Sequence, residues 1–388
     1  MNKVNYFNLI DFGSSKIRFS VFDSDLKEKF SETKTVTYNN ENYANHFDEI
    51  RKTVKKAEKK ISFHINDIIL ILDSPNLFTV EISLKKNLDK KSNFEKIYNA
   101  LILELYQLMN SHYDNQYLAH IIFDKCIIDN VIFEELPKEK VVNNDIKIDF
   151  KIICFPKILI KRIKDNFIKN NLNIINIYCS SYIKSKSYLK KLNRNKISFL
   201  EIGWERSSLM FYEKNKFKFI HAVPIGGFHI TKDISKIFKL SIDEAEKIKK
   251  LFNQSETEFS YKNSPSPESM FAKDIINKNI SIDILKQVVL YRVQEIIDLL
   301  FKKSSVKIYN YNLSDTELFL IGEGSILFNN NSFYLNDDFN FKSINFYSES
   351  DIQICSSGLI YHINNYETPK ITKKKLGLFE RFFNYFSK

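Results

Sequence analysis

Glycine is sparse in this chain: only eight glycines occur in 388 residues. A chain that uses glycine so rarely keeps it where a side chain has no room or where φ must be positive. Seven of the eight lie where a backbone would pass close to a bound phosphate or nucleoside: Gly13, Gly203, Gly226, Gly227, Gly322, Gly324 and Gly358. This pattern predicts a nucleotide site.

The bulk composition is that of an ordinary globular protein, with 44% hydrophobic and 27% charged residues. The length favours two or more lobes over one simple core. The four cysteines show no Cys-x-x-Cys spacing, which argues against a zinc site or a disulfide framework and suits a reducing compartment. No export signal or long uncharged apolar stretch is evident, so we expect a cytosolic protein.

The net charge of +11 is spread over the whole chain and mixed with 47 acidic residues. This balance indicates attraction to an acidic surface. No nucleic-acid-binding signature accompanies the charge, so we expect no nucleic-acid partner.

The first part of the chain predicts a lobe with an insertion. Residues 5–38 read as three strands, the first two joined by the turn at Gly13. A charged helix and a buried strand follow at 47–60 and 68–72. The pattern then changes to an α+β module, with strands at 78–83, 120–128 and 150–155 and an apolar helix at 94–109.

The second part repeats the opening pattern. Helices are expected at 157–169 and 182–190, on either side of a strand at 174–178. Three strands follow at 197–203, 208–212 and 216–224, and they repeat the pattern of the three strands in residues 5–38. The same pattern therefore occurs twice: a strand that ends in an acid, a glycine turn, and two more strands. This repeat predicts a duplicated lobe with nucleotide between the copies.

The second lobe has its own expected insertion. Ser241 and Glu244 form a capping box that opens a helix to about residue 251, followed by a loop over 253–268. A long helix is expected over 282–303 because its apolar residues recur at helical spacing. The chain returns through a strand at 318–321 into Gly322-Glu323-Gly324-Ser325.

In this order, these features resemble the actin, sugar-kinase and Hsp70 superfamily and, within it, the FtsA family of bacterial cell division. The first phosphate loop resembles Asp11-x-Gly13-Ser14-Ser15-Lys16, and Gly322-x-Gly324-Ser325 resembles the adenosine motif. The most specific match runs from Pro224 to Ile234 with the segment from Glu244 to Lys249. Residues 355–359 resemble the second connecting helix.

The resemblance implies ATP with Mg²⁺ as ligands. It places the phosphates at Gly13, Ser14, Ser15 and Lys16 and at the second phosphate loop with Gly203, and it counts Gly226 and Gly227 among the nucleotide-binding residues. The ribose and adenine would lie at Glu246, Lys249, Gly322, Gly324 and Ser325. Asp11 would bind the nucleotide and hold Mg²⁺ through water, and Glu201 is a second candidate for the metal. The resemblance singles out no catalytic residue.

The second phosphate loop departs from the family. An acid followed by a glycine run is replaced by Glu201-Ile202-Gly203-Trp204-Glu205-Arg206-Ser207-Ser208. Trp204 adds bulk, and Glu205 would repel a phosphate unless Arg206 offsets it. We therefore expect ATP to be bound as a structural ligand with weak or absent hydrolysis.

The last sixteen residues predict an amphipathic membrane-binding helix behind a polar linker. Leu376, Leu378, Phe379, Phe382, Phe383, Tyr385 and Phe386 fill one half of a helical projection, behind Lys373, Lys374 and Lys375. Docking of this stripe on the protein's own fold is the alternative. The phenylalanines and the basic cluster favour an anionic membrane surface.

The sequence thus predicts an α/β, actin-like (ribonuclease H-like), two-lobed fold with an inserted α+β module in the first lobe and a C-terminal amphipathic helix. The expected parts are the first lobe (1–79 and 157–195), its module (80–156), the second lobe (196–234 and 305–363), its insertion (235–304), a linker (364–372) and the tail (373–388).

The resemblance implies a peripheral membrane adaptor at the division site, on the inner face of the plasma membrane. It implies head-to-tail self-assembly, docking of the FtsZ C-terminal peptide on residues 235–304, and recruitment of later division proteins by the inserted module. The alternatives are another actin-like assembly protein such as the pilus-assembly protein PilM, or a small-molecule kinase of the same superfamily.

Overall fold

The computed structural model describes residues 6–36, 43–137, 141–192, 194–259, 280–302, 313–322, 324, 340–346 and 352–365. The chain divides into two compact units. Unit 1 comprises residues 1–81, 117–122 and 151–358, and unit 2 comprises residues 82–116, 123–150 and 359–388.

The first sheet of unit 1 has the strand order β11-β4-β1-β2-β3. Its strands are β1 (Phe7–Phe12), β2 (Lys16–Phe22), β3 (Glu28–Thr35), β4 (Asp67–Leu72) and β11 (Asn173–Cys179). β1, β2 and β3 form an antiparallel meander, whereas β4 lies parallel to both β1 and β11. The buried apolar runs of β1 and β4 are typical of central strands that are covered on both faces.

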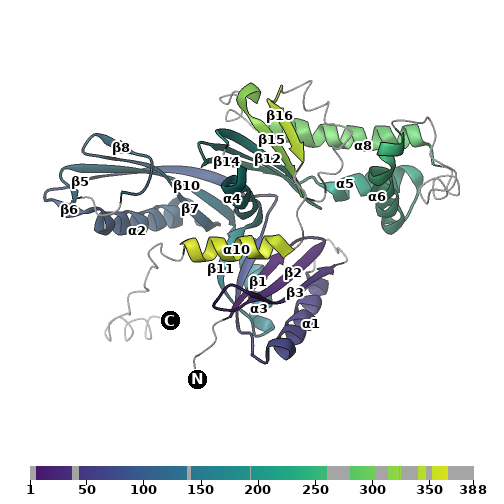
Figure 1. Ribbon diagram of the computed structural model, residues 1–388, viewed down its shortest axis with the longest axis horizontal. Helices are drawn as coiled ribbons and strands as arrows, with labels where there is room; N and C mark the ends of the chain where they lie inside the picture. Colours follow the sequence, from purple (N-terminus) through teal and green to yellow (C-terminus); the bar gives the residue numbers. More distant parts are fainter. Residues whose placement is uncertain are drawn as a thin grey trace. The chain divides into compact units, whose positions relative to one another are not determined.

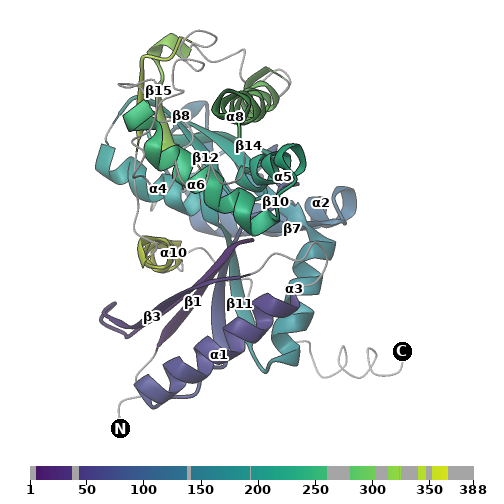
Figure 2. The ribbon, with the colours of Figure 1, turned by 90° about the vertical axis from the view of Figure 1, so that its right-hand side faces the viewer.

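Helices cover both faces of this sheet. α1 (Ala44–Ile61) packs on β2 and β3, and α3 (Lys157–Lys169) packs on β11. α10 (Ile352–Asn365) lies on the opposite side from α1 and α3 (Figure 2). Its Gly358 lies so close to Ile71 and Leu9 that an added Cβ would come within 2.3 Å of the Ile71 side chain.

The second sheet of unit 1 repeats the plan of the first, with the order β14-β13-β12-β15-β16 (Figure 1). Its strands are β12 (Lys196–Ile202), β13 (Ser207–Glu213), β14 (Lys216–Val223), β15 (Glu317–Ile321) and β16 (Ser343–Phe346). The first three again form an antiparallel meander, and β15 is parallel to β12 and β16. The predicted duplication and the α/β fold class are confirmed.

Helices α5 (Gly227–Phe238), α6 (Ile242–Phe259) and α8 (Ile282–Ile297) share a buried core with the second sheet. The capping box at the start of α6 is confirmed, since Ser241 Oγ and Glu244 N lie 3.3 Å apart and Glu244 Oε2 accepts from Ser241 N at 2.9 Å. The prediction of a loop from residue 253 is wrong for residues 253–259, because α6 continues to Phe259. The long helix expected to 303 ends at Ile297 and passes into a π-helical turn, Asp298–Lys302.

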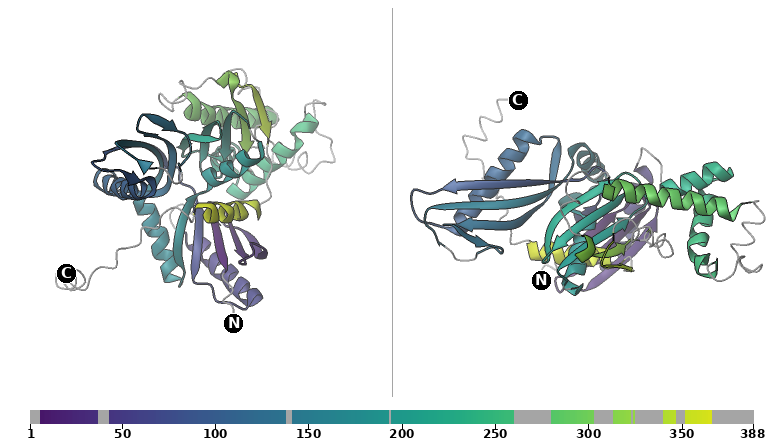
Figure 3. Two further views of the ribbon diagram at one scale, coloured as in Figure 1. Left: turned by 60° about the vertical axis from the view of Figure 1, so that its left-hand side comes forward. Right: turned by 90° about the horizontal axis from the view of Figure 1, so that it is seen from above.

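Unit 2 contains most of a four-stranded sheet in the order β5-β10-β7-β8. These strands are β5 (Phe78–Asn87), β7 (Gln116–Ile128), β8 (Val131–Phe133) and β10 (Asp145–Pro156), and β6 (Ser92–Asn93) pairs with β9 (Val141–Val142). Figure 3 shows α2 (Phe94–His112) along one face of the sheet, and the rings of Tyr98 and Phe150 lie 6.0 Å apart. The described helices include none that is long and apolar enough to cross a bilayer.

Candidate functional site

Two glycine turns occupy equivalent places in the two sheets of unit 1. Gly13 N donates to Lys16 O at 3.0 Å between β1 and β2, and Gly203 N donates to Arg206 O at 2.8 Å between β12 and β13. The turns are tight, because an added Cβ on Gly13 would lie 2.8 Å from Lys16 O. The duplicated pattern therefore places Asp11 and Glu201 at matching positions, two residues before each glycine.

Asp11 is neutralised within its own hairpin. The β1–β2 register puts Asp11 opposite Arg18, and Arg18 Nη1 donates to Asp11 Oδ2 at 2.8 Å. Ser180 Oγ lies 3.4 Å from Asp11 Oδ1. Because directly opposed residues of an antiparallel pair have neighbouring side chains, the hairpin register could have revealed this ion pair from the sequence.

Glu201 is neutralised differently, because the position equivalent to Arg18 holds Ser208. The countercharge comes from α4 (Ser180–Leu192), whose Lys184 Nζ donates to Glu201 Oε1 at 2.6 Å. Ser181 Oγ donates to Glu201 Oε2 at 2.6 Å. Burial opposes ionisation of Glu201, but the charges of Lys184 and Arg206 outweigh it and lower the pKa of this carboxyl to about 2.

Asp73, which directly follows β4, joins the two sheets. Arg206 Nη2 donates to Asp73 Oδ2, Ser181 N donates to the same oxygen at 3.1 Å, and Cys179 Sγ lies 3.1 Å from Asp73 Oδ1. Arg206 Nη2 also lies 3.5 Å from Glu201 Oε2. Burial raises the pKa of Asp73, and the Arg206 charge opposes that rise. Nothing in the sequence singled out Asp73, which is separated from Arg206 by 133 positions.

These side chains form one neutral group, which we call the charge cluster: Asp11, Arg18, Asp73, Lys184, Glu201 and Arg206. Each acid has a basic partner, and the six side chains are only 4–13% exposed. The carboxylates expected to hold Mg²⁺ are therefore occupied by the protein's own cations. In the described part of the chain, no group of three or more His, Cys, Asp or Glu residues could hold a metal ion.

The residues present thus do not fit the divalent cation that the resemblance implies. Mg²⁺ needs carboxylate oxygens that are free to accept it or its ordered waters in octahedral geometry. Here the oxygens of Asp11, Asp73 and Glu201 accept from cationic or hydroxyl donors instead.

The segment 203–206 is anchored on the first turn of α5. Gly227 N donates to Gly203 O at 2.9 Å, and Phe228 N donates to Trp204 O at 2.7 Å. The first N–H groups of a helix can bind an anion. In α5, those of Gly227 and Phe228 donate to the 203–206 segment instead. Gly226 is required for this contact, since a Cβ there would lie 2.5 Å from Gly203 O.

Trp204 lies against Lys249, one of the two side chains expected to reach the ribose. Its indole stacks on Phe228, and Lys249 Nζ lies 5.0 Å from the centroid of its ring. Lys249 Nζ also donates to Thr231 Oγ1 at 2.8 Å and pairs with Glu246 Oε2 at 2.6 Å. Glu246 and Lys249 are thus brought together, as their spacing predicts, and both contact protein groups.

Gly322 and Gly324, expected to lie against the nucleoside, pack closely against atoms of the protein itself. Gly322 has φ +84°, and a Cβ on it would lie 3.2 Å from the Glu201 side chain. A Cβ on Gly324 would lie 2.6 Å from Ile202 O. Close packing of the two strand ends therefore accounts for both glycines, and their role toward a nucleoside stays a prediction. Ser325 and the membrane-binding residues at 373–388 lie outside the described residues.

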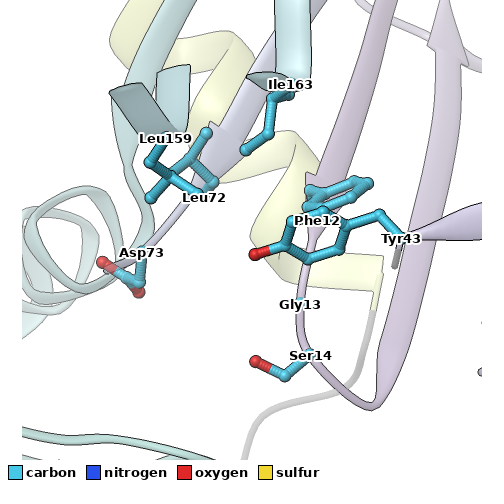
Figure 4. Close-up of a pocket in the computed structure, with 8 residues that line it drawn as sticks. All are labelled: Phe12, Gly13, Ser14, Tyr43, Leu72, Asp73, Leu159 and Ile163. Carbon is cyan, nitrogen blue, oxygen red and sulfur yellow. The ribbon is translucent and has the colours of Figure 1, made fainter. Parts of the chain in front are cut away.

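A small pocket lies beside the first glycine turn, with a volume of about 30 Å³. It is lined by Phe12, Gly13, Ser14, Tyr43, Leu72, Asp73, Leu159 and Ile163 (Figure 4). A volume of this size corresponds to about one water molecule. A ligand pocket is typically ten or more times larger, so a nucleotide would have to move the surrounding side chains to enter here.

Comparisons with known proteins agree with this architecture. Residues 199–325 match the family model "Cell division protein FtsA". The FtsA protein of Bacillus subtilis is 20% identical over 259 residues, which cover 64% of this chain and 57% of the relative. That of Staphylococcus epidermidis is 22% identical over 292 residues, covering 71% of this chain and 60% of the relative.

The chain therefore spans about 57–60% of the length of these curated relatives. Among solved structures, a PilM–PilN type IV pilus biogenesis complex matches with a TM-score of 0.59 and 13% identity, covering 93% of this chain and 98% of that one. The expected resemblance is confirmed: residues 199–325 match the FtsA family model, these FtsA relatives are 20–22% identical, and the fold is similar to that of an actin-like protein.

Proposed function

We propose that the protein is an FtsA-type adaptor of bacterial cell division, which self-assembles and tethers FtsZ filaments to the inner face of the plasma membrane at the division site. The observation that carries this proposal is the FtsA match over residues 199–325. That range includes the last part of β12, the strands β13 and β14, the helices α5, α6 and α8, and β15. The match therefore covers part of the expected second lobe and all of the expected insertion at 235–304, to which we assign FtsZ binding.

The FtsZ C-terminal peptide is proposed to dock on the insertion at 235–304. α8 offers an exposed apolar stripe there, because Ile284 is 45% and Tyr291 74% exposed. The two residues are seven positions apart and therefore lie on one face of the helix. Exposed aromatic side chains of this kind are favoured anchors of peptide complexes.

The direct test is fluorescence anisotropy with a labelled FtsZ C-terminal peptide. Tyr291→Ala should weaken binding by about tenfold without unfolding the protein, since the side chain is mostly in solvent. Ile158→Ala is the matched control, because Ile158 is 73% exposed on α3, away from the proposed site. Equal affinities for the wild type and Tyr291→Ala would contradict docking on this stripe.

Membrane attachment is proposed for the tail at 373–388 on the sequence pattern alone. Flotation with anionic liposomes should carry the full chain to the lipid fraction, while a chain shortened by residues 373–388 should stay below. Replacing Phe382 and Phe383 with serine keeps the length and charge of the tail and should have the same effect. Continued flotation of both variants would mean that the membrane contact lies elsewhere.

ATP is the proposed ligand between the two sheets of unit 1, with slow or absent hydrolysis. Support comes from the two equivalent glycine turns and from the placement of Glu246 and Lys249 together. The charge cluster favours the non-hydrolytic form of the proposal, because its three carboxylates are paired with cations and are therefore poor bases for activating water. Steady-state phosphate release that is fast and Mg²⁺-dependent would refute it.

The inserted module is proposed to mediate head-to-tail polymer contacts and to recruit later division proteins. A cysteine introduced by Ile132→Cys would test the polymer contact, since Ile132 is 63% exposed on β8. We expect it to cross-link to the neighbouring molecule in the polymer. Sedimentation without lipid would show whether the polymer forms independently of the membrane.

The PilM-like alternative is favoured by one specific observation, the fold similarity along nearly the whole chain. A pilus-assembly protein should neither float with liposomes through residues 373–388 nor bind the FtsZ peptide. These two assays therefore distinguish the two actin-like functions.

A further inference from the structure

The charges between the two sheets of unit 1 cancel without any added ion. Asp11 pairs with Arg18 at 2.8 Å, Glu201 with Lys184 at 2.6 Å, and Asp73 with Arg206. A divalent cation brought to this place would meet three acids that already have cationic partners. It would also meet the repulsion of Lys184 and Arg206, which is strong in a buried environment.

The carboxylate oxygens also accept hydrogen bonds from protein donors. Asp73 accepts from Ser181 N and Arg206, with Cys179 Sγ in contact. Glu201 accepts from Ser181 Oγ and Lys184 and lies beside Arg206. A metal ion could bind only after several charge-assisted hydrogen bonds had broken, and those are the stronger kind.

Arg206 is held in place by its own loop. Its backbone oxygen accepts from Gly203 N, and its Nη1 donates to Ser208 Oγ at 2.9 Å. The neighbouring Trp204 is fixed by its stacking on Phe228 and by the bond from Phe228 N to Trp204 O. The guanidinium is therefore preorganised between Asp73 and Glu201, and little side-chain entropy is lost when it pairs with them.

We propose that Arg206, together with Lys184, is the built-in cation of this site and takes the place of a divalent metal ion. The two sheets are then held together across Asp73 and Glu201 by side chains of the protein alone. It follows that the folded state of the chain is indifferent to Mg²⁺. This inference does not depend on FtsZ, on lipid or on the affinity for ATP.

Thermal unfolding of the full chain provides the test, with Mg²⁺ compared with EDTA at constant ionic strength. The wild type should show the same Tm in both. Arg206→Ala leaves Asp73 and Glu201 with one countercharge fewer, so its Tm should fall by several degrees in EDTA. Mg²⁺ should restore a large part of that loss, because the two carboxylates can now accept the ion.

Two further variants keep the test decisive. Arg206→Lys retains the positive charge and should remain indifferent to Mg²⁺, although the loss of the second donor should lower its Tm. The double variant Asp73→Asn with Arg206→Ala removes one acid and its partner, so it should fold even if Arg206→Ala alone does not. The double variant should show no Mg²⁺ response.

A Mg²⁺-specific rise in the Tm of the wild type would overturn the proposal, as would an Arg206→Ala variant that folds and ignores Mg²⁺. A Mg²⁺ response in the double variant would also overturn it. None of these outcomes bears on the adaptor function, since the readout contains neither FtsZ nor lipid. Failure of the proposed function is measured separately, by peptide binding and flotation.

Discussion

The indole of Trp204 and the phenyl ring of Phe228 are stacked, with their centroids 5.0 Å apart and their planes inclined by 21°. Trp204 is the only tryptophan in the chain. Its fluorescence therefore reports on the segment 203–206 alone. This stack joins the loop that carries Arg206 to the first turn of α5.

Replacing Phe228 with leucine should shift the tryptophan emission to the red, because the indole loses its stacking partner and gains water. The bulk of the side chain is largely kept, so we expect a stability loss of under about 1.5 kcal/mol. Phe63→Leu is the control, because Phe63 is 47% exposed and is not in contact with the indole. An unchanged spectrum for Phe228→Leu would contradict the stacked arrangement.

The adjacent glycines 226 and 227 should respond differently to alanine. A Cβ on Gly226 would lie 2.5 Å from Gly203 O and 2.8 Å from Trp204 O, and these backbone atoms cannot easily move aside. Gly226→Ala should therefore lower the free energy of unfolding by about 1–3 kcal/mol. On Gly227 the nearest atom would be Lys249 Nζ at 3.5 Å. Gly227→Ala should then stay within about 0.5 kcal/mol of the wild type in urea unfolding.

The ionised Glu201 should make unit 1 sensitive to acid. Its pKa is about 2 in the folded chain, below the ordinary value of 4.5. The stabilisation by this carboxylate is therefore complete above about pH 4.5 and is lost as the pH falls toward 2.

Glu201→Gln should remove this part of the pH dependence of the unfolding free energy. At neutral pH it should also cost about 3–5 kcal/mol, because Lys184 is left buried beside a neutral amide. Asp48→Asn serves as the control, since the Asp48–Arg51 pair is 56% exposed on both sides. A Glu201→Gln variant with the acid profile of the wild type would show that other carboxylates dominate.

Asp129 organises the turn after β7 in unit 2. Its carboxylate accepts from Asn143 N at 3.0 Å and from Asn144 N at 2.8 Å, and its φ is 47°. Asp129→Ala should lower the Tm, because it removes the acceptor and places alanine in a left-handed conformation. Asp129→Asn keeps one acceptor oxygen and tolerates this conformation, so it should recover much of the loss. Equal Tm values for the two variants would argue against this role of the carboxylate.

The sequence predicted the two meanders well because both faces of each central strand are buried. The apolar runs of β1, β4 and β12 and the polar turns between the strands determine the elements locally. The Ser241–Glu244 cap was likewise predictable, since its donors and acceptors lie three positions apart. Short strands such as β6, β8 and β9 were missed, because two or three residues carry no periodic signal.

The charge cluster was only half predictable. Asp11 and Glu201 follow from the repeated motif, and Asp11 with Arg18 follows from the hairpin register. The partners of Glu201 and Arg206 could not be predicted in this way. Lys184, which pairs with Glu201, lies on α4, and Asp73, which pairs with Arg206, follows the end of β4. Helix α5 was missed for a local reason: Gly226-Gly227 reads as a turn, whereas Gly227 begins the helix that anchors segment 203–206.

The neutrality of the charge cluster has a consequence at long range. Three acids and three bases that cancel within a buried space produce little electric field beyond it, so the formal excess of +11 belongs to the rest of the chain. Any steering of the protein toward an anionic bilayer or an acidic peptide must then come from outward-facing lysines and arginines, and salt in the medium should weaken it.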